Sequence, residues 1–220
     1  MGRVPHVSMF SKVLVANRGE IAVRVLQTLQ AMGIATAAVY SDPDANAPHV
    51  ALADEAFALG GSTAEETYLD RDKIIQLAVA CGAQAVHPGY GFLAENPTFS
   101  RECAEAGLVF IGPSPETIAL LGDKIRSKET AVQAGVPVVP SSPVWRPKES
   151  QPDDISSGIG FPLLVKAAAG GGGRGMRIVE RAQDLEPALE SASREAASAF
   201  GDGHVFLERY VPAARHVEFQ

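Results

Sequence analysis

Cysteine, positive charge and long apolar runs are all scarce in this chain of 220 residues. Its two cysteines, Cys81 and Cys103, form neither a Cys-x-x-Cys pair nor a metal-ligand spacing, so we expect free thiols in a reducing compartment. Lys and Arg number 19 against 26 Asp and Glu, and the formal charge of −7 argues against non-specific nucleic-acid binding. No apolar run reaches the ~18 residues of a membrane span, and the opening octapeptide lacks the apolar stretch of a secretion signal. These absences predict a cytoplasmic protein with neither nucleic acid nor membrane as a partner.

Hydrophobic residues make up 46% of the chain and charged residues 20%, which is typical of a globular protein. In the first 113 residues, short apolar segments alternate with amphipathic helical patterns. Strands are predicted over residues 12–17, 34–40, 55–59, 83–86 and 108–111, and helices over 18–33, 70–81 and 97–106. This alternation predicts an α/β fold with a mostly parallel, right-handed, doubly wound sheet. Ligands bind such sheets at the carboxyl ends of strands, where residues 17–20 and 87–91 fall.

The second half of the chain follows a proline-rich stretch, which we predict to be a linker. Its prolines are Pro137, Pro140, Pro143, Pro147 and Pro152. Helical patterns cover residues 116–134, with an interruption at 122–124, and 184–199, and strands are predicted over 205–211 and from 217 onward. We predict an N-terminal extension over residues 1–10, a first domain over 11–122 and a second over 123–220. Because no cap or turn follows the last strand, we expect the sequence to be truncated.

A glycine-rich segment lies between two apolar strands and reads LLVKAAAGGGGRGMRIV over residues 163–179. Each of the five glycines between Gly170 and Gly175 would cost roughly 0.5–1 kcal/mol relative to alanine inside a helix or strand. The segment is therefore predicted to be a loop whose bare N–H groups can approach phosphate oxygens closely. Lys166 and Arg174 add positive charge beside it. The alternative is a surface hairpin whose basic neighbours have no ligand.

Two common nucleotide-binding motifs do not fit this segment. A Walker loop places its lysine after the glycines and opens a helix, whereas here Lys166 precedes them and a strand pattern follows. Protein kinases share the strand–loop–strand order, but their glycine spacing and His-Arg-Asp segment are absent. A weak dinucleotide fingerprint, Gly-x-Gly-x-x-Ala over residues 89–94, lacks an acidic residue about 20 positions later. The alternative there is a tight loop capped by Asn96 and Pro97. A flap that folds over a nucleotide is favoured for residues 163–179.

Six segments carry a resemblance to one family: VLVANRGEIA (13–22), HPGYGFLAEN (87–96), FIGP (110–113), GDK (122–124), GGGGRGM (170–176) and RHVE (215–218). In this order they resemble the biotin carboxylase family from Phe10 to Gln220, and the segment at 87–96 is highly specific. The chain is similar to the biotin carboxylase part of actinobacterial acyl-CoA carboxylase α subunits. The resemblance implies an ATP-grasp enzyme, with a pre-ATP-grasp domain over 11–122 and the first part of the ATP-grasp domain over 123–220.

The family reaction activates bicarbonate as carboxyphosphate with ATP and Mg²⁺ (or Mn²⁺), and then carboxylates biotin. The resemblance therefore implies an ATP-dependent ligase that acts on biotin held by a carrier domain. It also implies a carboxyltransferase subunit as partner, and a homodimer or larger complex at full length. The acceptors of such carboxylases are acetyl-, propionyl- or methylcrotonyl-CoA, and pyruvate and urea carboxylases share the same module.

The resemblance assigns ATP binding to residues throughout the second domain. These are Lys124 and Lys166 on the phosphates, Gly172, Gly173 and Met176 in the flap, Glu208, Arg209, Tyr210 and Val211 in an adenine-binding hinge, and His216 beside the nucleotide. The hinge is expected to offer adenine a carboxylate or carbonyl acceptor and a backbone N–H donor. Lys166 ends an apolar strand, where an unpaired ammonium would be expensive, and this also favours a ligand role. From the residues alone, Lys124 also fits a solvated helix start and His216 a surface position.

In the first domain, Tyr90, Gly91 and Glu95 match the biotin and bicarbonate side of the family. No catalytic or metal-binding residue is expected within the chain, because the family's metal-binding glutamates, general base and catalytic arginine match positions beyond Gln220. We accordingly expect that the 220 residues alone do not carboxylate biotin. Two alternatives stay open: another ATP-grasp ligase, such as a carbamoyl-phosphate-synthetase-like or amino-acid-ligase module, which the segment at 87–96 disfavours, and a non-catalytic nucleotide-binding protein.

Overall fold

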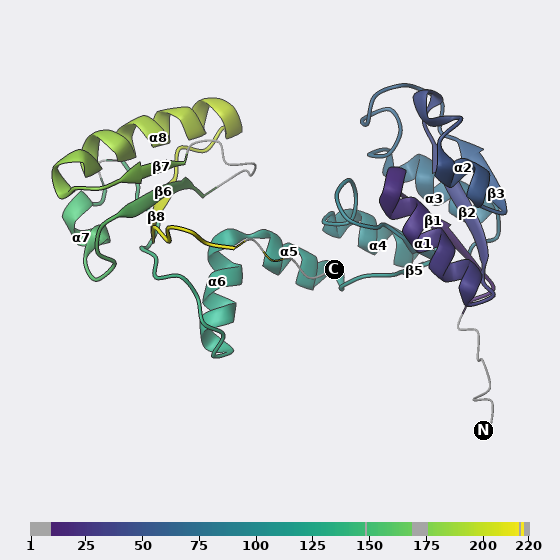
Figure 1. Cartoon of the computed structure of the whole chain (residues 1–220), viewed down its shortest axis with the longest axis horizontal. Helices are drawn as coiled ribbons and strands as arrows, with labels where there is room; N and C mark the ends of the chain where they lie inside the picture. The colour runs from purple at the N-terminus through teal and green to yellow at the C-terminus, as the bar shows by residue number, and fades with distance from the viewer. Residues whose placement is uncertain (1–9, 148, 169–175, 216, 218–220) are drawn as a thin grey trace. The chain divides into compact units, whose positions relative to one another are not determined.

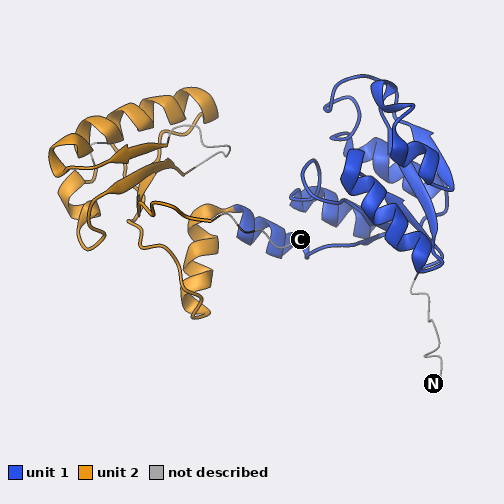
Figure 2. Ribbon diagram, in the orientation of Figure 1, with its two compact units in different colours: residues 1–122, 220 blue, residues 123–219 orange. Residues whose placement is uncertain are grey.

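The chain is divided into two compact units, residues 1–122 and residues 123–219. The computed structural model describes residues 10–147, 149–168, 176–215 and 217. Figure 1 gives the element labels and Figure 2 colours the two units separately. Each unit has its own sheet and its own hydrophobic core, and each is described by itself below.

Unit 1 is built on a parallel sheet of five strands in the order β3-β2-β1-β4-β5. The strands are β1 (Lys12–Val15), β2 (Ala35–Tyr40), β3 (Glu55–Ala58), β4 (Ala85–His87) and β5 (Val109–Phe110). Around them lie α1 (Gly19–Ala31), η1 (Asp42–Asp44), α2 (Pro48–Leu52), α3 (Arg71–Ala80), α4 (Pro97–Glu105) and α5 (Pro115–Gly122). The predicted α/β class and mostly parallel sheet are confirmed.

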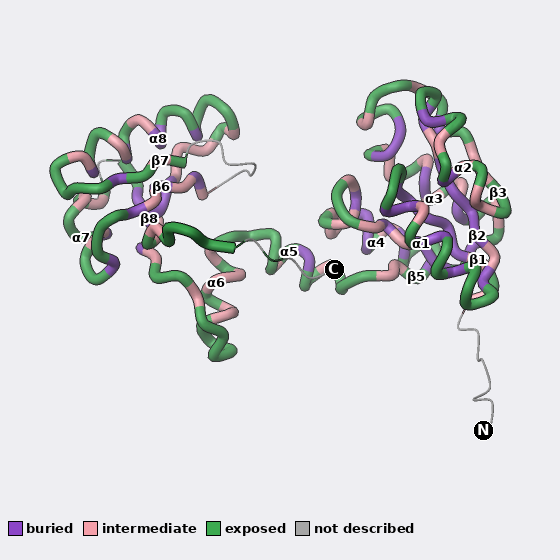
Figure 3. Tube along the Cα trace, viewed as in Figure 1, coloured by how far each residue is buried: buried purple, intermediate pink, exposed green. Residues whose placement is uncertain are grey.

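Both faces of the unit 1 sheet are covered, because alternate residues of each strand point to opposite sides. Leu14 and its same-face neighbours pack against α3 and α4, with Phe99 and Cys103 fully buried on that side. Val13 and Val15 face the other way, against the apolar side of α1. Figure 3 shows buried residues concentrated along these central strands. With both faces covered by apolar packing, the space for a ligand is not on the sheet faces, and the loops at the strand ends carry the polar residues Asn17, Arg18 and Tyr90.

The helix ends of unit 1 follow the predicted local chemistry. Helix α1 closes at Met32, and Gly33 then adopts a left-handed φ of 75°, as a residue just past a helix C-terminus often does. Helix α4 begins with Pro97 at its first turn, and the Asn96 side chain caps it by accepting a 3.0 Å hydrogen bond from the Phe99 amide. A turn and the Asn96 cap therefore separate residues 89–91 from the helix, as the tight-loop alternative required.

Unit 2 carries an antiparallel sheet of three strands in the order β7-β6-β8. Its elements are α6 (Lys124–Gln133), α7 (Pro152–Ser156), β6 (Leu163–Ala167), β7 (Arg177–Val179), η2 (Ala182–Asp184), α8 (Leu185–Phe200) and β8 (Val205–Arg209). Helix α8 lies across one face of this sheet (Figure 1), and its Leu185 and Leu189 are buried against the strands. The predicted break between two helices at residues 122–124 is confirmed, since α5 ends at Gly122 and α6 begins at Lys124.

The proline-rich stretch is not a linker, contrary to prediction. It lies within unit 2, where Trp145 is only 4% exposed and exchanges backbone hydrogen bonds with Val205. Ser141 forms a second bridge to Glu208, and the carbonyl of Pro140 accepts from the Arg209 amide. The prediction failed because proline loses only its donor and can still extend a sheet edge through its carbonyl. The strand predicted from residue 217 lies outside the described residues except for Val217, which is in no strand.

Candidate functional site

The strands of unit 2 carry polar side chains on the face opposite α8. Leu163, Val165 and Ala167 of β6 pack against α8, so the intervening Lys166 points to the other side. On β8, Val205 and Leu207 likewise face α8, which places Glu208 on the side of Lys166. Lys166 pairs with Phe206 and Leu164 with Glu208 in the antiparallel register. Lys166 and Glu208 are therefore diagonal neighbours across the two strands, within reach of each other's long side chains.

Three lysines and one glutamate form a cluster on this face, which we call the lysine cluster: Lys124, Lys128, Lys166 and Glu208. The Glu208 carboxylate is shared, with Oε1 2.5 Å from Lys128 Nζ and Oε2 2.6 Å from Lys166 Nζ. Lys124 Nζ lies 3.5 Å from the carbonyl oxygen of Ala167, at the end of β6. Lys124 and Lys128 are one helical turn apart on α6 and so share a face of that helix.

The lysine cluster has more positive than negative charge. Burial lowers the pKa of Lys124, and the neighbouring charge of Lys166 lowers it further, while Glu208 acts in the opposite direction. Burial works against ionisation of Glu208, but the hydrogen bonds from Lys128 and Lys166 outweigh it and lower the pKa of the carboxyl. Among the described residues, one carboxylate thus lies near three ammonium groups, an arrangement that suits a polyanion such as a polyphosphate.

The Lys166 ammonium is paired within the protein, because Glu208 accepts from it on the adjacent strand, so the cost of an unpaired ammonium no longer argues for a ligand there. Lys128 was missed altogether, although its spacing of four residues from Lys124 on a helix is a readable signal. Glu208 belongs to the predicted hinge, yet its carboxylate is engaged by both lysines. Of the two acceptors expected to meet adenine, a backbone carbonyl is therefore the better placed.

The rest of the hinge is also partly engaged. The Arg209 guanidinium donates two hydrogen bonds to the Ile159 carbonyl, at 2.9 and 2.6 Å. Its amide donates to Pro140, and the Tyr210 amide donates to Pro162. Val211 lies beyond these bonds and is exposed, as is Met176 just before β7. The predicted residues Gly172, Gly173 and His216 lie outside the described part of the chain.

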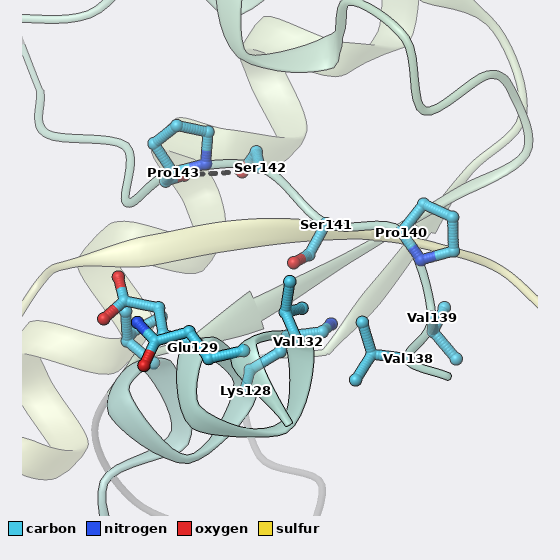
Figure 4. A pocket seen from close by; sticks show the side chains of 11 residues that line it. Lys128, Glu129, Val132, Val138, Val139, Pro140, Ser141, Ser142 and Pro143 are labelled. Atoms are coloured by element: carbon cyan, nitrogen blue, oxygen red, sulfur yellow. Dashed lines mark hydrogen bonds between the residues drawn. The ribbon is translucent and has the colours of Figure 1, made fainter. Parts of the chain in front are cut away.

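A hollow of about 510 Å³ adjoins the lysine cluster at Lys128, between α6 and the segment 138–143. Figure 4 shows the side chains that surround it, from α6 on one side and the extended segment 138–143 on the other. Val132, Val138 and Val139 contribute apolar surface, and Val132 is 57% exposed. Lys128 belongs to the lysine cluster and also lines the hollow, whereas Lys124, Lys166 and Glu208 do not line it.

In unit 1, polar residues gather where β1 and β4 end side by side, because parallel neighbours present their carboxyl ends at one sheet edge. Asn17 follows β1 and is 2% exposed; its Nδ2 donates to the carbonyls of Pro88 at 2.7 Å and Tyr90 at 2.9 Å. The Tyr90 hydroxyl bonds to the Glu20 carboxylate of α1, and this bond raises the pKa of Tyr90. The predicted residue Gly91 has a left-handed φ of 71° in the same loop.

A second polar group lies at the neighbouring strand end. The Arg18 guanidinium forms two bonds of 2.5 Å with the Asp44 carboxylate, which also accepts from the Tyr68 hydroxyl at 2.7 Å. The Arg18 hydrogen bond is the main cause that holds the pKa of Asp44 far below its usual range. These bonds tie the end of β1 to the turn after β2. The predicted residue Glu95 lies apart from them and lines a hollow of about 340 Å³ beside α5.

No three His, Cys, Asp or Glu side chains of the described segments gather closely enough to hold a metal ion. No helix of the described segments is long and apolar enough to cross a membrane. The polar sites that remain are the lysine cluster of unit 2 and the strand-end loops of unit 1.

Two family profiles match the chain. One is described as biotin carboxylase, N-terminal domain, and covers residues 9–118; the other is described as carbamoyl-phosphate synthase L chain, ATP binding domain, and covers residues 123–220. The chain belongs to the biotin carboxylase family. The predicted ATP-grasp fold is confirmed with it.

Relatives and solved structures agree with this assignment. The chain is 50% identical to a biotin-dependent acyl-coenzyme A carboxylase α3 subunit of Mycobacterium leprae, over 97% of this chain and 36% of that protein. It is 48% identical, with a TM-score of 0.81, to the biotin carboxylase domain dimer of Hydrogenobacter thermophilus 2-oxoglutarate carboxylase in complex with MgADP, ADP and bicarbonate. A biotin carboxylase from Campylobacter jejuni is 43% identical, with a TM-score of 0.80. The two structural matches cover 93% and 92% of this chain, and 45% of each solved chain. The chain thus spans less than half the length of these relatives.

Proposed function

We propose that this chain supplies the ATP-phosphate-binding lysines and the biotin-side loop of a biotin carboxylase, which uses MgATP and bicarbonate to carboxylate biotin on a carrier domain. The observation that carries the proposal is the lysine cluster. In the described part of unit 2, three lysines converge near one carboxylate, and lysine ammonium groups are fitting ligands for a nucleotide polyphosphate. Relatives of the same fold are solved with ADP and bicarbonate, which supports this choice among polyanions.

The residues of unit 2 then have distinct tasks. Lys124 and Lys166 bind phosphate oxygens from α6 and β6, and Lys128 keeps Glu208 occupied so that Lys166 can turn to the ligand. The backbone of Glu208–Val211, with Met176, forms the adenine contact. Gly172, Gly173 and His216 complete the ATP site. The described residues offer no carboxylate set for Mg²⁺, so the metal is not assigned to them.

The residues of unit 1 provide the other substrate contacts. Tyr90, Gly91 and Glu95 face biotin and bicarbonate, and Tyr90 and Gly91 lie in the loop that Asn17 holds at the end of β4. We infer a cytoplasmic enzyme that works as a dimer with a biotin carboxyl carrier domain and a carboxyltransferase subunit. An acyl-CoA carboxylase is our choice of subtype, and the 50% identity to the Mycobacterium leprae subunit supports it.

The test is an assay of ADP release by the protein expressed over its whole reading frame. We expect release to require bicarbonate and to be stimulated by biotin. Lys166→Met should abolish it, while Lys73→Met, which removes a half-buried lysine of α3 paired with Asp70, serves as the charge-matched control and should leave it intact. ADP release that is independent of both bicarbonate and biotin in the wild-type protein would contradict the proposal.

A second measurement addresses the base. An acceptor and a donor on the hinge backbone match the edge of adenine, whereas guanine presents the opposite pattern and leaves buried groups unpaired at about 1–3 kcal/mol each. We expect ADP to bind at least tenfold more tightly than GDP by calorimetry, because about 1.4 kcal/mol corresponds to tenfold. Equal affinities would remove the hinge assignment and leave the phosphate contacts standing.

A further inference from the structure

Asn17 is a buried polar side chain of unit 1 whose amide is fully hydrogen-bonded. It is 2% exposed, and it joins the end of β1 to the loop that follows β4. Its Nδ2 donates to Pro88 O and to Tyr90 O, and its Oδ1 accepts from the Arg18 amide at 2.8 Å. Both amide hydrogens and the oxygen are thus committed. The orientation of the amide is fixed, since a flipped group would place its oxygen against two carbonyl oxygens.

Gly89 shows how closely the loop approaches this amide. A Cβ at Gly89 would lie 2.8 Å from Asn17 Nδ2 and 3.1 Å from Ile21 Cγ1, and the φ of 67° is already unfavourable for other residues. The Gly89 amide donates at 3.0 Å to Nδ1 of His87, the last residue of β4. The loop is therefore held at three successive residues: Asn17 binds the carbonyls of Pro88 and Tyr90, and His87 accepts from the Gly89 amide between them.

We propose that Asn17 is a positioning residue for biotin: it sets the backbone of the 88–91 loop so that Tyr90 and Gly91 meet the biotin ring. The inference rests on the proposed function, because it takes Tyr90 and Gly91 as the biotin side. Asn17 itself is buried and acts through the loop. Removing its Nδ2 leaves the carbonyls of Pro88 and Tyr90 without this donor, so the loop rearranges to find others and carries Tyr90 away from its place.

The test compares Asn17→Ala and Asn17→Asp with the wild-type protein expressed over its whole reading frame. Bicarbonate-dependent ATP turnover is measured against free biotin and, separately, against ATP. We expect KM for biotin to rise about tenfold or more, since small displacements of substrate-positioning groups have effects of this size. KM for ATP should stay within about twofold, because the lysine cluster belongs to the other unit.

The matched control is Thr36→Val. Thr36, in β2, is also buried in unit 1, and its hydroxyl donates at 2.7 Å to Asp54 just before β3; the bonds of this hydroxyl are to Asp54 and not to the 88–91 loop. Thermal unfolding of all three variants is followed in parallel. If Asn17 has a purely structural role, Asn17→Ala and Thr36→Val should raise KM for biotin by the same factor when they lower the melting temperature by the same amount. That result would overturn the inference.

A second variant keeps the inference testable if Asn17→Ala fails to fold. Gly89→Ala brings its Cβ against Asn17 Nδ2, so we expect the same selective rise in KM for biotin. Unchanged KM for biotin in every variant that folds would also overturn the positioning role. The two proposals fail differently: if wild-type turnover shows no response to biotin, the proposed function is wrong, whereas a biotin response that survives Asn17→Ala and Gly89→Ala refutes only the role of Asn17.

Discussion

The sheet of unit 1 is covered by helices on both faces, whereas α8 covers one face of the sheet of unit 2 and Lys166 and Glu208 lie on the other, beside the buried Phe206. In unit 1 the central strands are mostly apolar, and the candidate substrate contacts lie in the loops at the strand ends. In unit 2 the strands themselves carry Lys166 and Glu208 on the face away from the core. The comparison shows that candidate functional side chains lie where apolar packing leaves room. In a sheet covered on both faces they lie at the strand ends, and in a sheet covered on one face they lie on the other face.

The strongest way to separate the two units is to damage one core at a time. Phe99→Ala in unit 1 should lower the free energy of unfolding of that unit by about 3–5 kcal/mol, because a fully buried ring is replaced by a cavity. Leu189→Ala should cost unit 2 about 2–5 kcal/mol for the same reason. Hydrogen exchange resolved by peptide is the measurement. Equal loss of protection in both units from either variant would show that the cores are not independent.

Next in size is the effect of removing a phosphate ligand from the open face of unit 2. Lys166→Met should weaken ADP binding by about 1.5–3 kcal/mol, the usual worth of a hydrogen bond to a charged group. Calorimetric titration measures it. Lys12→Met, at an ion pair with Glu55 in unit 1, is the control and should bind ADP like the wild type. A shift below twofold for Lys166→Met would exclude this lysine from the nucleotide site.

A smaller effect is expected for the lysine that only holds Glu208. Lys128→Met should weaken ADP binding by about 1 kcal/mol, less than Lys166→Met. In this variant Glu208 has lost its bond to Lys128, so it binds Lys166 more strongly and competes with phosphate for that ammonium group. Combining Lys128→Met with Glu208→Gln should recover part of the loss, because the competing charge is gone. Additive losses in the double variant would place Lys128 on the nucleotide directly.

The smallest predicted effect concerns acid sensitivity of unit 1. Burial is the main cause that lowers the pKa of His49 and His87 below 6.5, and the charge of Arg24 adds to the effect at His87. The unfolded chain takes up these protons near pH 6.5 while the native unit does not, so the free energy of unfolding is unaffected above that pH and falls below it. We expect about 1 kcal/mol or less between pH 7.5 and 5.5 in urea denaturation. His87→Asn, which keeps an acceptor for the Gly89 amide, should reduce that slope.

Much of unit 1 could be predicted because its strands and helices are each specified locally. Apolar period and capping residues located all five strands and helices α1, α3 and α4 to within a few residues. The lysine cluster was harder. Lys124 and Lys166 were proposed through the resemblance, but the ion pair between Lys166 and Glu208 joins residues 42 apart in sequence and depends on the register of β6 and β8. No local pattern encodes a register of that kind.

The proline-rich stretch failed for a related reason. Proline is a strong signal for irregular backbone, yet Trp145 among these prolines is a large apolar residue that a linker has no means to bury. The presence of this tryptophan was the sign of a folded segment that the sequence offered, and the structure places Trp145 in the core of unit 2. Asn17 illustrates the opposite case. The sequence placed it in a loop at a strand end, but its Nδ2 donates to residues more than 70 positions away. Its role in holding that loop could therefore not be predicted from the residues around it in sequence.

The thiol of Cys103 can report local opening of unit 1. Burial, with the charge of Glu102 as a lesser cause, raises the pKa of its thiol to about 12, and no part of the residue is exposed. The thiolate is the form that alkylating reagents attack, so this sulfur reacts only while the helix around it is open. Cys81, at the end of α3, is partly exposed and reports ordinary access. The ratio of the labelling rate of Cys103 to that of Cys81 therefore reports how often unit 1 opens locally, and no engineered probe is needed to measure it.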